Sequence, residues 1–144
     1  MILSEKIQQA ARDLSLTPVY GETWQQNVTA DNISYPALFL DLIEEQMDTL
    51  DADKVYNDVS FFIGYQSKIN EMYSYYSEKI RQAKKDALQM LIKIEQLRED
   101  GAPLVKSIDN IRISEIQQIT IYDLPLSGVT VQFNMTAHNY ENRC

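Results

Sequence analysis

The chain has 144 residues, about the modal length of one domain, so a single domain spanning residues 1–144 is expected. An apolar content of 44% with only four glycines and four prolines excludes a disordered or low-complexity chain. With 21 acidic and 13 basic residues, the net charge of −8 argues against nucleic-acid or anionic-lipid partners. Because Cys144 is the only cysteine and no apolar stretch reaches the length of a membrane helix, we expect no intrachain disulfide, export signal or membrane span.

The N-terminal segment predicts one short helix followed by a long loop. Ser4 can act as the N-cap of a helix whose apolar residues recur at spacings of three and four: Ile7, Ala10, Ala11 and Leu14. This helix should end before Thr17-Pro18. Residues 18–36 are rich in polar side chains, contain the single Trp24 and have no sustained period, so they predict a long loop of the kind that contacts partners.

Residues 37–65 predict a hairpin with an acidic connection. Residues 37–43 (ALFLDLI) alternate in a way that favours a strand, although Pro36 and the acidic residues that follow would also suit a helix. The acidic stretch 44–53 then serves as the connection. Residues 55–65 alternate again and contain a strongly apolar Phe-Phe-Ile sequence, which is typical of a second strand.

A long amphipathic helix is predicted from about residue 67 to residue 98. Its apolar residues form one stripe: Tyr73, Tyr76, Ile80, Ala83, Ala87, Leu91, Ile94 and Leu97. Asp86 and the neighbouring lysines should lie away from this stripe. The sequence Gly101-Ala102-Pro103 supplies a C-cap glycine followed by a residue that cannot continue the helix.

The last third of the chain predicts a second hairpin, with strands at 108–121 and 129–138 around a Leu-Pro-Leu-Ser-Gly turn at 124–128. In the second strand, alternate residues should face the core: Val129, Val131, Phe133, Met135 and Ala137. The element order predicts an α+β fold. We expect an antiparallel four-stranded sheet made of two hairpins, with the long helix and the short N-terminal helix packed on one face.

Residues that could perform catalysis or hold a cofactor do not form a recognisable set. His138 is the only histidine, and it lies far from Cys144 without an obvious carboxylate partner, so neither a nucleophile–base pair nor a zinc site is expected. The glycines are too widely spaced to form a phosphate-binding loop. A calcium loop aligned on Asp51 would place Val55 where an oxygen ligand is needed. We therefore expect no metal, no cofactor and no enzyme; an enzyme would need a pocket in which acids such as Asp41, Glu44 and Asp58 converge.

The sequence instead predicts a surface for partners. Exposed strand edges are templates for pairing, and an aromatic residue in a long polar loop is a typical interface anchor. The residues expected at this interface are Trp24, Tyr35, Glu44, Glu45, Asp48 and Asp51.

The order of these elements resembles a family of phage proteins. A short N-terminal helix, a Tyr35-Pro36 entry into an apolar strand, a second strand ending in Phe61-Phe62-Ile63-Gly64-Tyr65-Gln66, a long helix and a last hairpin are similar to the small neck and tail-completion proteins of tailed phages. The tail terminator group is the most similar. The resemblance covers nearly the whole chain and rests on element order, without a diagnostic motif.

The resemblance implies a ring, typically hexameric, at the head-proximal end of the tail of a virion. Such a ring stops polymerisation of the tail tube and supplies the surface that joins the head, and its subunits have no catalytic residues. The implied partners are further copies of the chain, the tail-tube protein and neck or connector proteins, after synthesis in the host cytoplasm. Genome DNA would only pass through the lumen, which suits an acidic chain. The alternatives are a head-closure or connector adaptor protein of the same particle, or a non-viral α+β protein-interaction domain.

Overall fold

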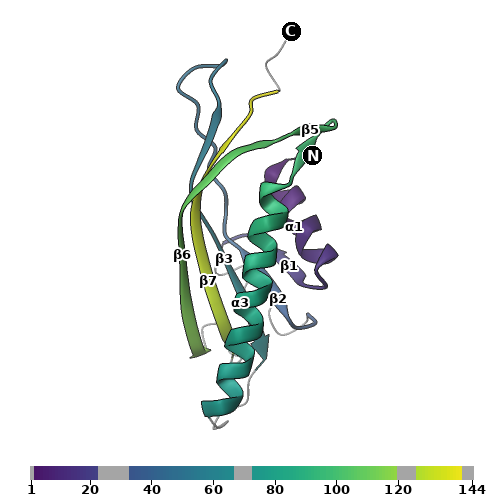
Figure 1. Ribbon diagram of the computed structural model, residues 1–144, viewed down its shortest axis with the longest axis vertical. Helices are drawn as coiled ribbons and strands as arrows, with labels where there is room; N and C mark the ends of the chain where they lie inside the picture. The colour runs from purple at the N-terminus through teal and green to yellow at the C-terminus, as the bar shows by residue number, and fades with distance from the viewer. Residues whose placement is uncertain (1, 23–32, 67–72, 120–125, 141–144) are drawn as a thin grey trace.

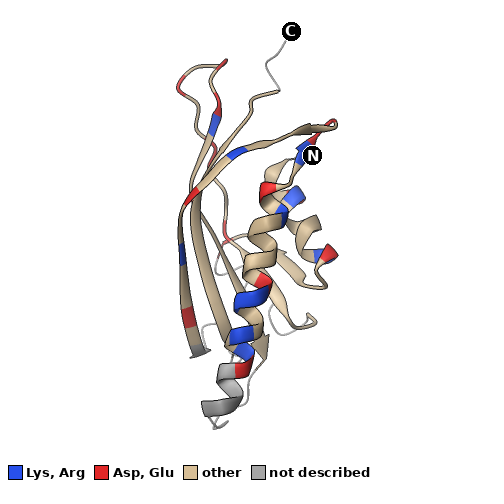
Figure 2. Ribbon diagram, in the orientation of Figure 1, with Lys and Arg blue, Asp and Glu red and all other residues tan. Residues whose placement is uncertain are grey.

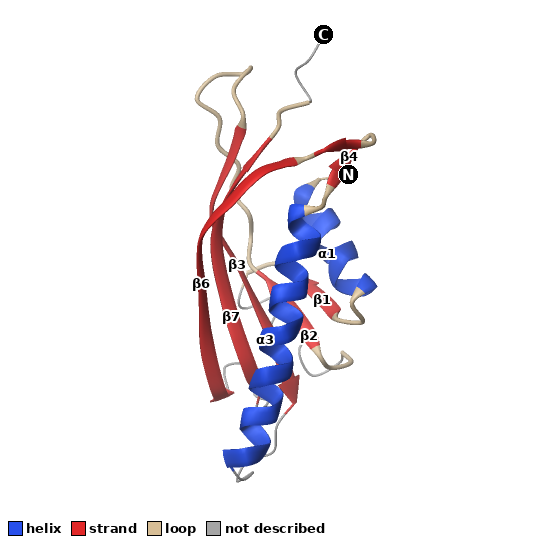
Figure 3. Cartoon of the chain, viewed as in Figure 1, coloured by secondary structure: helices blue, strands red, loops and turns tan. Residues whose placement is uncertain are grey.

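The computed structural model describes residues 2–22, 33–66, 73–119 and 126–140. These residues form an α+β structure, as the sequence predicts, in which a curved sheet carries two helices (Figures 1 and 3). The elements in chain order are α1 (Leu3–Asp13), β1 (Thr17–Tyr20), β2 (Ala37–Leu40), β3 (Lys54–Gln66), α3 (Tyr73–Glu95), β4 (Arg98–Glu99), β5 (Ala102–Pro103), β6 (Val105–Ile119) and β7 (Leu126–Ala137).

Five of the strands form one mixed sheet in the order β1-β2-β3-β7-β6, and β4 pairs with β5 separately. The predicted pairs β2–β3 and β6–β7 are antiparallel, so both hairpins are confirmed. The prediction of a four-stranded, wholly antiparallel sheet is wrong, because β1 adds a fifth strand parallel to β2. The sequence pattern did not predict β1, because this strand is short and contains Pro18. The neighbouring Thr17 donates its N–H toward β2, to the carbonyl of Pro36 at 3.1 Å, so the imino nitrogen of Pro18 points away from the ladder.

Both helices cover the same face of the sheet, where the main core lies (Figure 1). The predicted alternation of β7 is confirmed, since its odd-numbered residues from Val129 to Ala137 are all buried in this core. A smaller apolar cluster occupies the opposite face, around Phe39 and Leu126. Strand β2 is therefore buried on both faces, which explains why its sequence is a continuous apolar run.

Helix α3 confirms most of the predicted stripe, since Ile80, Ala83, Ala87, Leu91 and Ile94 are buried. The helix ends at Glu95, earlier than predicted, while residues 67–72 and the side chains of Tyr73 and Tyr76 lie outside what the structure describes. Gly101 is not its C-cap. It lies in the turn between β4 and β5, where its φ of 82° suits a residue without a Cβ.

Asp86 is the one charged residue of α3 that was predicted on the wrong face. Its side chain is buried, and it accepts a hydrogen bond from the hydroxyl of Tyr65 on β3 and another from Gln82 at 3.1 Å. Burial, followed by the hydrogen bond to Asp86, raises the pKa of the Tyr65 hydroxyl well above its ordinary value. Helical period alone assigns a carboxylate to solvent, but here a donor from the sheet allows its burial.

Two other local predictions are corrected. Helix α1 begins at Leu3 with Ile2 at the N-cap position, so Ser4 is a buried residue within the helix rather than its cap. Leu-Ser-Gly at 126–128 belongs to β7 rather than to a turn, while residues 124 and 125 lie outside the described residues. Gly128 is needed for close backbone approach, because a Cβ there would lie 1.8 Å from the carbonyl oxygen of Ile63.

The sheet bends where bulges in β3 and β6 flank the same part of β7. Asp58 and Asn110 have positive φ values of 54° and 52° at these bulges, a conformation that Asp and Asn tolerate better than most residues. The backbone N–H of Asp58 donates to the side-chain oxygen of Asn134 on β7 at 2.9 Å. Beyond the bend, β6 curves across the C-terminal end of α3 toward β5 (Figure 1).

Candidate assembly interface

The connection between β2 and β3, residues 41–53, carries four of the residues predicted at a partner surface. Glu44, Glu45, Asp48 and Asp51 are all exposed on it. Figure 2 shows acidic residues along this segment, which projects at one end of the molecule. The structure therefore brings these four carboxylates onto one projecting segment.

The two predicted aromatic anchors are not part of this segment. Tyr35 lies before the start of β2, whereas the acidic residues follow its end. The ring of Tyr35 is half-buried and lies 6.4 Å from that of Phe39, measured between ring centroids, in the small cluster on the face opposite the helices. Trp24 lies outside the described residues. The structure thus separates Tyr35 from the acidic residues.

Polar contacts from the core hold the segment in place. Asn139, which follows β7 and is 7% exposed, directs its amide nitrogen to the carbonyl oxygens of Leu50 at 2.9 Å and Ala52 at 3.0 Å. Gln46 and Val55 exchange two backbone hydrogen bonds of 2.8 Å at the base of the segment. Because the amide nitrogen of Asn139 meets two carbonyl oxygens of the segment, polar contacts anchor the segment, which has no apolar core of its own.

Glu45 has a structural role within the segment. Its carboxylate accepts a hydrogen bond from the Tyr56 hydroxyl at 2.5 Å and lies 3.3 Å from the ammonium of Lys54. Lys54 is buried, and a buried ammonium is stable only with such a partner. Glu44 and Asp48 have no ion-pair partner within the described part of the chain, so they are the carboxylates best placed to meet another molecule.

A second ion pair joins α1 to β4 beside this network. The Lys6 ammonium lies 3.0 Å from the Glu99 carboxylate and donates to the Arg98 carbonyl at 2.8 Å. The hydrogen bond from Lys6 holds the pKa of Glu99 below its usual range. Both ion pairs line one small cavity of about 60 Å³, so α1, β3 and β4 are joined by charge at the base of the acidic segment.

Exposed apolar side chains lie among the acidic residues, at positions that were not predicted to belong to an interface. Leu42 and Leu50 are 54% and 73% exposed, and Met47 is also exposed. Large apolar side chains at this exposure on an ordered segment are typical of an interaction site when they cluster and are surrounded by polar residues. The available signal was the presence of Met47 and Leu50 within the predicted acidic connection 44–53. Leu42 was predicted within the strand 37–43, but β2 ends at Leu40, so Leu42 belongs to the exposed segment instead.

The larger groove of about 290 Å³ lies between α1 and the C-terminal end of α3. Its walls mix the cations Lys6, Lys93 and Arg98 with Asp13. Two of these groups are already engaged, because Lys6 binds Glu99 and Asp13 accepts from Gln9 at 3.1 Å. This groove therefore presents weaker chemistry for a partner than the acidic segment.

The two sheet edges, which the sequence analysis also considered as interfaces, differ strongly. Edge strand β1 has four residues and contains proline. Edge strand β6 has 15 residues, but three irregularities interrupt its register with β7, and charged residues such as Arg112 lie along it. Bulges and charges are the usual protection of an edge against pairing. The structure therefore favours the acidic segment over β6 as the first contact surface.

The acids considered for an enzyme do not form a metal site among the described residues. Asp58 lies in the β3 bulge and pairs with Arg112 at 3.2 Å, while Asp41 and Glu44 belong to the segment after β2. Within the described ranges, no three histidine, cysteine or acidic side chains are arranged to hold a metal ion. No described helix is both long enough and apolar enough to cross a membrane.

The chain matches no protein-family model, no curated protein and no solved structure.

Proposed function

We propose that this chain is the tail terminator subunit of a tailed bacteriophage. In this proposal six copies form a ring at the head-proximal end of the tail, stop polymerisation of the tail tube and supply the surface that joins the head. The observation that carries the proposal is the 41–53 segment, on which Glu44 and Asp48, without an ion-pair partner among the described residues, lie beside exposed apolar side chains, and whose backbone is held by Asn139. An ordered, partly apolar projection on a small scaffold suits contact between subunits.

Element order and charge support the same proposal. The short helix, apolar strand pair, long helix and last hairpin occur in the order on which the resemblance to terminator proteins rests. A net charge of −8 would let a ring surround a DNA path without binding the phosphate backbone. The proposed partners are further copies of the chain, the tail-tube protein and the neck or connector proteins.

The proposal is tested by mixing the purified protein with polymerising tail tubes and measuring tube length and end density by electron microscopy. We expect a ring at one end of each tube and arrested growth. Glu44→Lys/Asp48→Lys should abolish capping, whereas Glu5→Lys/Asp109→Lys, which changes the same number of exposed carboxylates elsewhere, should preserve it. Unchanged tube length without density at either end would refute the terminator proposal. Binding to a portal or adaptor ring in place of the tube would instead identify a neck protein.

A further inference from the structure

Helix α3 carries an exposed stripe of mixed basic and apolar character. The stripe consists of exposed residues that share one face of successive helical turns, and its members are Arg81, Lys84, Lys85, Leu88 and Ile92. Leu88 and Ile92 are 48% and 56% exposed, which is unusual for two large apolar side chains one turn apart on a helix that already buries a full apolar face. We call these five residues the α3 stripe.

The α3 stripe lies on the flank of the helix away from α1. The other flank faces α1, since Lys93 and Leu97 line the groove between the two helices. Lys84 and Lys85 have no ion-pair partner among the residues that the structure describes, so their charge is available to another molecule. The stripe is thus a local basic and apolar surface, bounded by Glu78, which pairs with Arg81, and by the exposed Glu95, on a chain whose net charge is −8.

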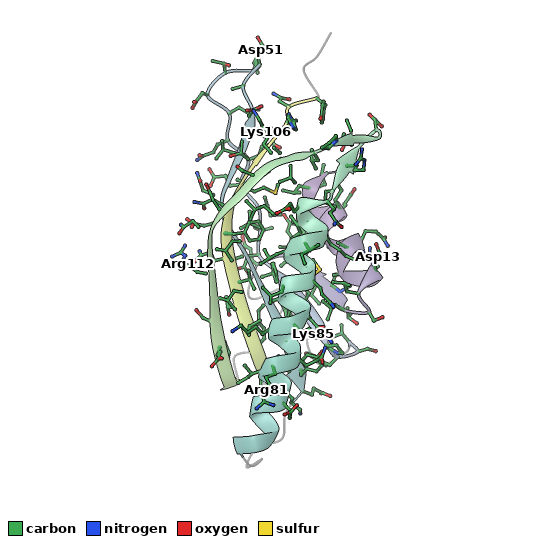
Figure 4. The ribbon with its side chains drawn as sticks, in the orientation of Figure 1. Asp13, Asp51, Arg81, Lys85, Lys106 and Arg112 are labelled. Atoms are coloured by element: carbon green, nitrogen blue, oxygen red, sulfur yellow. The ribbon has the colours of Figure 1, made fainter. Side chains whose placement is uncertain are left out.

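The 41–53 segment has the complementary character. Its exposed side chains include three large apolar residues and two carboxylates without a described partner: Leu42, Glu44, Met47, Asp48 and Leu50. We call these five residues the acidic loop. Figure 4 places Asp51 of the same segment at one end of the long axis of the molecule, and Arg81 and Lys85 toward the other end. The basic end of the α3 stripe therefore lies apart from this segment within one copy.

We propose that the α3 stripe of one copy binds the acidic loop of a second copy. In this contact Leu50 packs against Leu88 and Ile92, while the loop carboxylates lie beside the ammonium groups of the stripe. Each copy uses a different surface toward each neighbour, so the contact is heterologous and closes into a ring when the rotation between copies permits. The inference rests on the proposed function, because it assigns the subunit contact that such a ring requires.

Charge reversal provides the central test, by sedimentation velocity of the full chain at several concentrations. Lys84→Glu/Lys85→Glu and Glu44→Lys/Asp48→Lys should each weaken self-association by roughly tenfold or more, since like charges then face each other. An equimolar mixture of the two variants should associate within about threefold of the wild type, because opposite charges meet again at every contact. The matched control Arg12→Glu/Lys93→Glu makes the same charge change outside the α3 stripe and should leave association unchanged.

Removal of an apolar side chain separates this contact from pairing at the β6 edge. Leu50→Ser should weaken association, whereas Ile111→Ser, at an exposed apolar position on β6, should not. The opposite result would assign the interface to β6 and overturn the inference. Failure of the mixed charge variants to associate, or a wild type that stays monomeric up to about 1 mM, would also overturn it.

The result on tail tubes distinguishes this inference from the proposed function. A chain that caps tubes, but whose self-association is unaffected by the charge reversals, keeps its function and loses this interface. A chain that associates through the α3 stripe but does not bind tubes keeps the interface and loses the proposed function.

Discussion

Replacing Asn139 tests whether its buried side-chain amide holds the 41–53 segment in place. In Asn139→Ala, the carbonyls of Leu50 and Ala52 lose donors at 2.9 and 3.0 Å. Each lost hydrogen bond contributes about 1 kcal/mol net, and more if its carbonyl stays buried, so we expect the free energy of unfolding to fall by ~2 kcal/mol. We expect no larger loss because the segment is exposed and the two carbonyl groups can bind water instead.

Asn139→Asp provides a sharper form of the same test. The carboxylate has the same shape but places oxygen where the two carbonyl oxygens need a donor, so the destabilisation should exceed that of Asn139→Ala by at least ~1 kcal/mol at neutral pH. This excess should shrink as the pH falls toward about 4, because a protonated carboxyl group can donate one hydrogen bond again.

Urea unfolding gives the global stability of these variants, and amide hydrogen exchange reports the loop directly. The backbone N–H of Gln46 donates to Val55 at 2.8 Å and that of Ala52 donates to Thr49 at 3.1 Å, so both amides should exchange faster in Asn139→Ala. Stability within ~0.5 kcal/mol of the wild type, together with unchanged exchange at these amides, would refute the role assigned to Asn139.

Four further predictions concern the scaffold. Leu91→Asp should prevent folding because it buries an unpaired charge, whereas Lys84→Asp on the exposed flank should leave the melting temperature nearly unchanged; circular dichroism against temperature distinguishes them. Gly128→Ala should lower the free energy of unfolding by ~1–3 kcal/mol or more, because the added Cβ would clash with the backbone of Ile63. Gly64→Ala should lower it less, because its Cβ first meets the ring edge of Phe62, at 2.8 Å, and a side chain can move; urea unfolding compares the two variants. Burial and the Asp86 hydrogen bond raise the pKa of Tyr65 above the unfolded value of 10.0, so its stabilisation is complete below pH 10 and is lost as the pH rises further. Relative to Tyr65→Phe, the wild type should lose up to ~1.4 kcal/mol per pH unit above that point in urea unfolding, and parallel curves would contradict this. Addition of a chelator should not shift the melting curve, and a clear loss of stability would indicate a bound metal.

The elements that the sequence predicted correctly are those in which side-chain burial determines the pattern. The core face of α3 and the alternation of β7 depend on apolar residues that meet one core, so their periods are visible in the sequence. Strand β1 lacks such a pattern. Its place in the sheet depends on backbone pairing with β2 at register Thr17 to Ala37, and four residues are too few to establish a period.

The candidate site could be predicted only in part, because its geometry depends on distant residues. The charge of the 41–53 segment is evident in the sequence, and its carboxylates do lie together. The hydrogen bond that holds the loop joins Asn139 to Leu50, which is 89 residues away. Likewise, Asp86 is buried because Tyr65 lies opposite it on β3. Neither contact leaves a signal in local composition or period.

The bend of the sheet links these distant parts and determines where the acidic loop projects. The bulges at Asp58 and Asn110 flank Asn134, so β3, β7 and β6 change direction together at one level of the sheet. Beyond that level, β3 leads back to the loop and β7 leads to Asn139, whose amide binds the loop backbone. Because bulges and hydrogen bonds fix both strands, the loop keeps a defined direction relative to α3. A heterologous contact needs this constancy, since the angle between two surfaces of one subunit decides whether a chain of copies closes into a ring or continues as a filament.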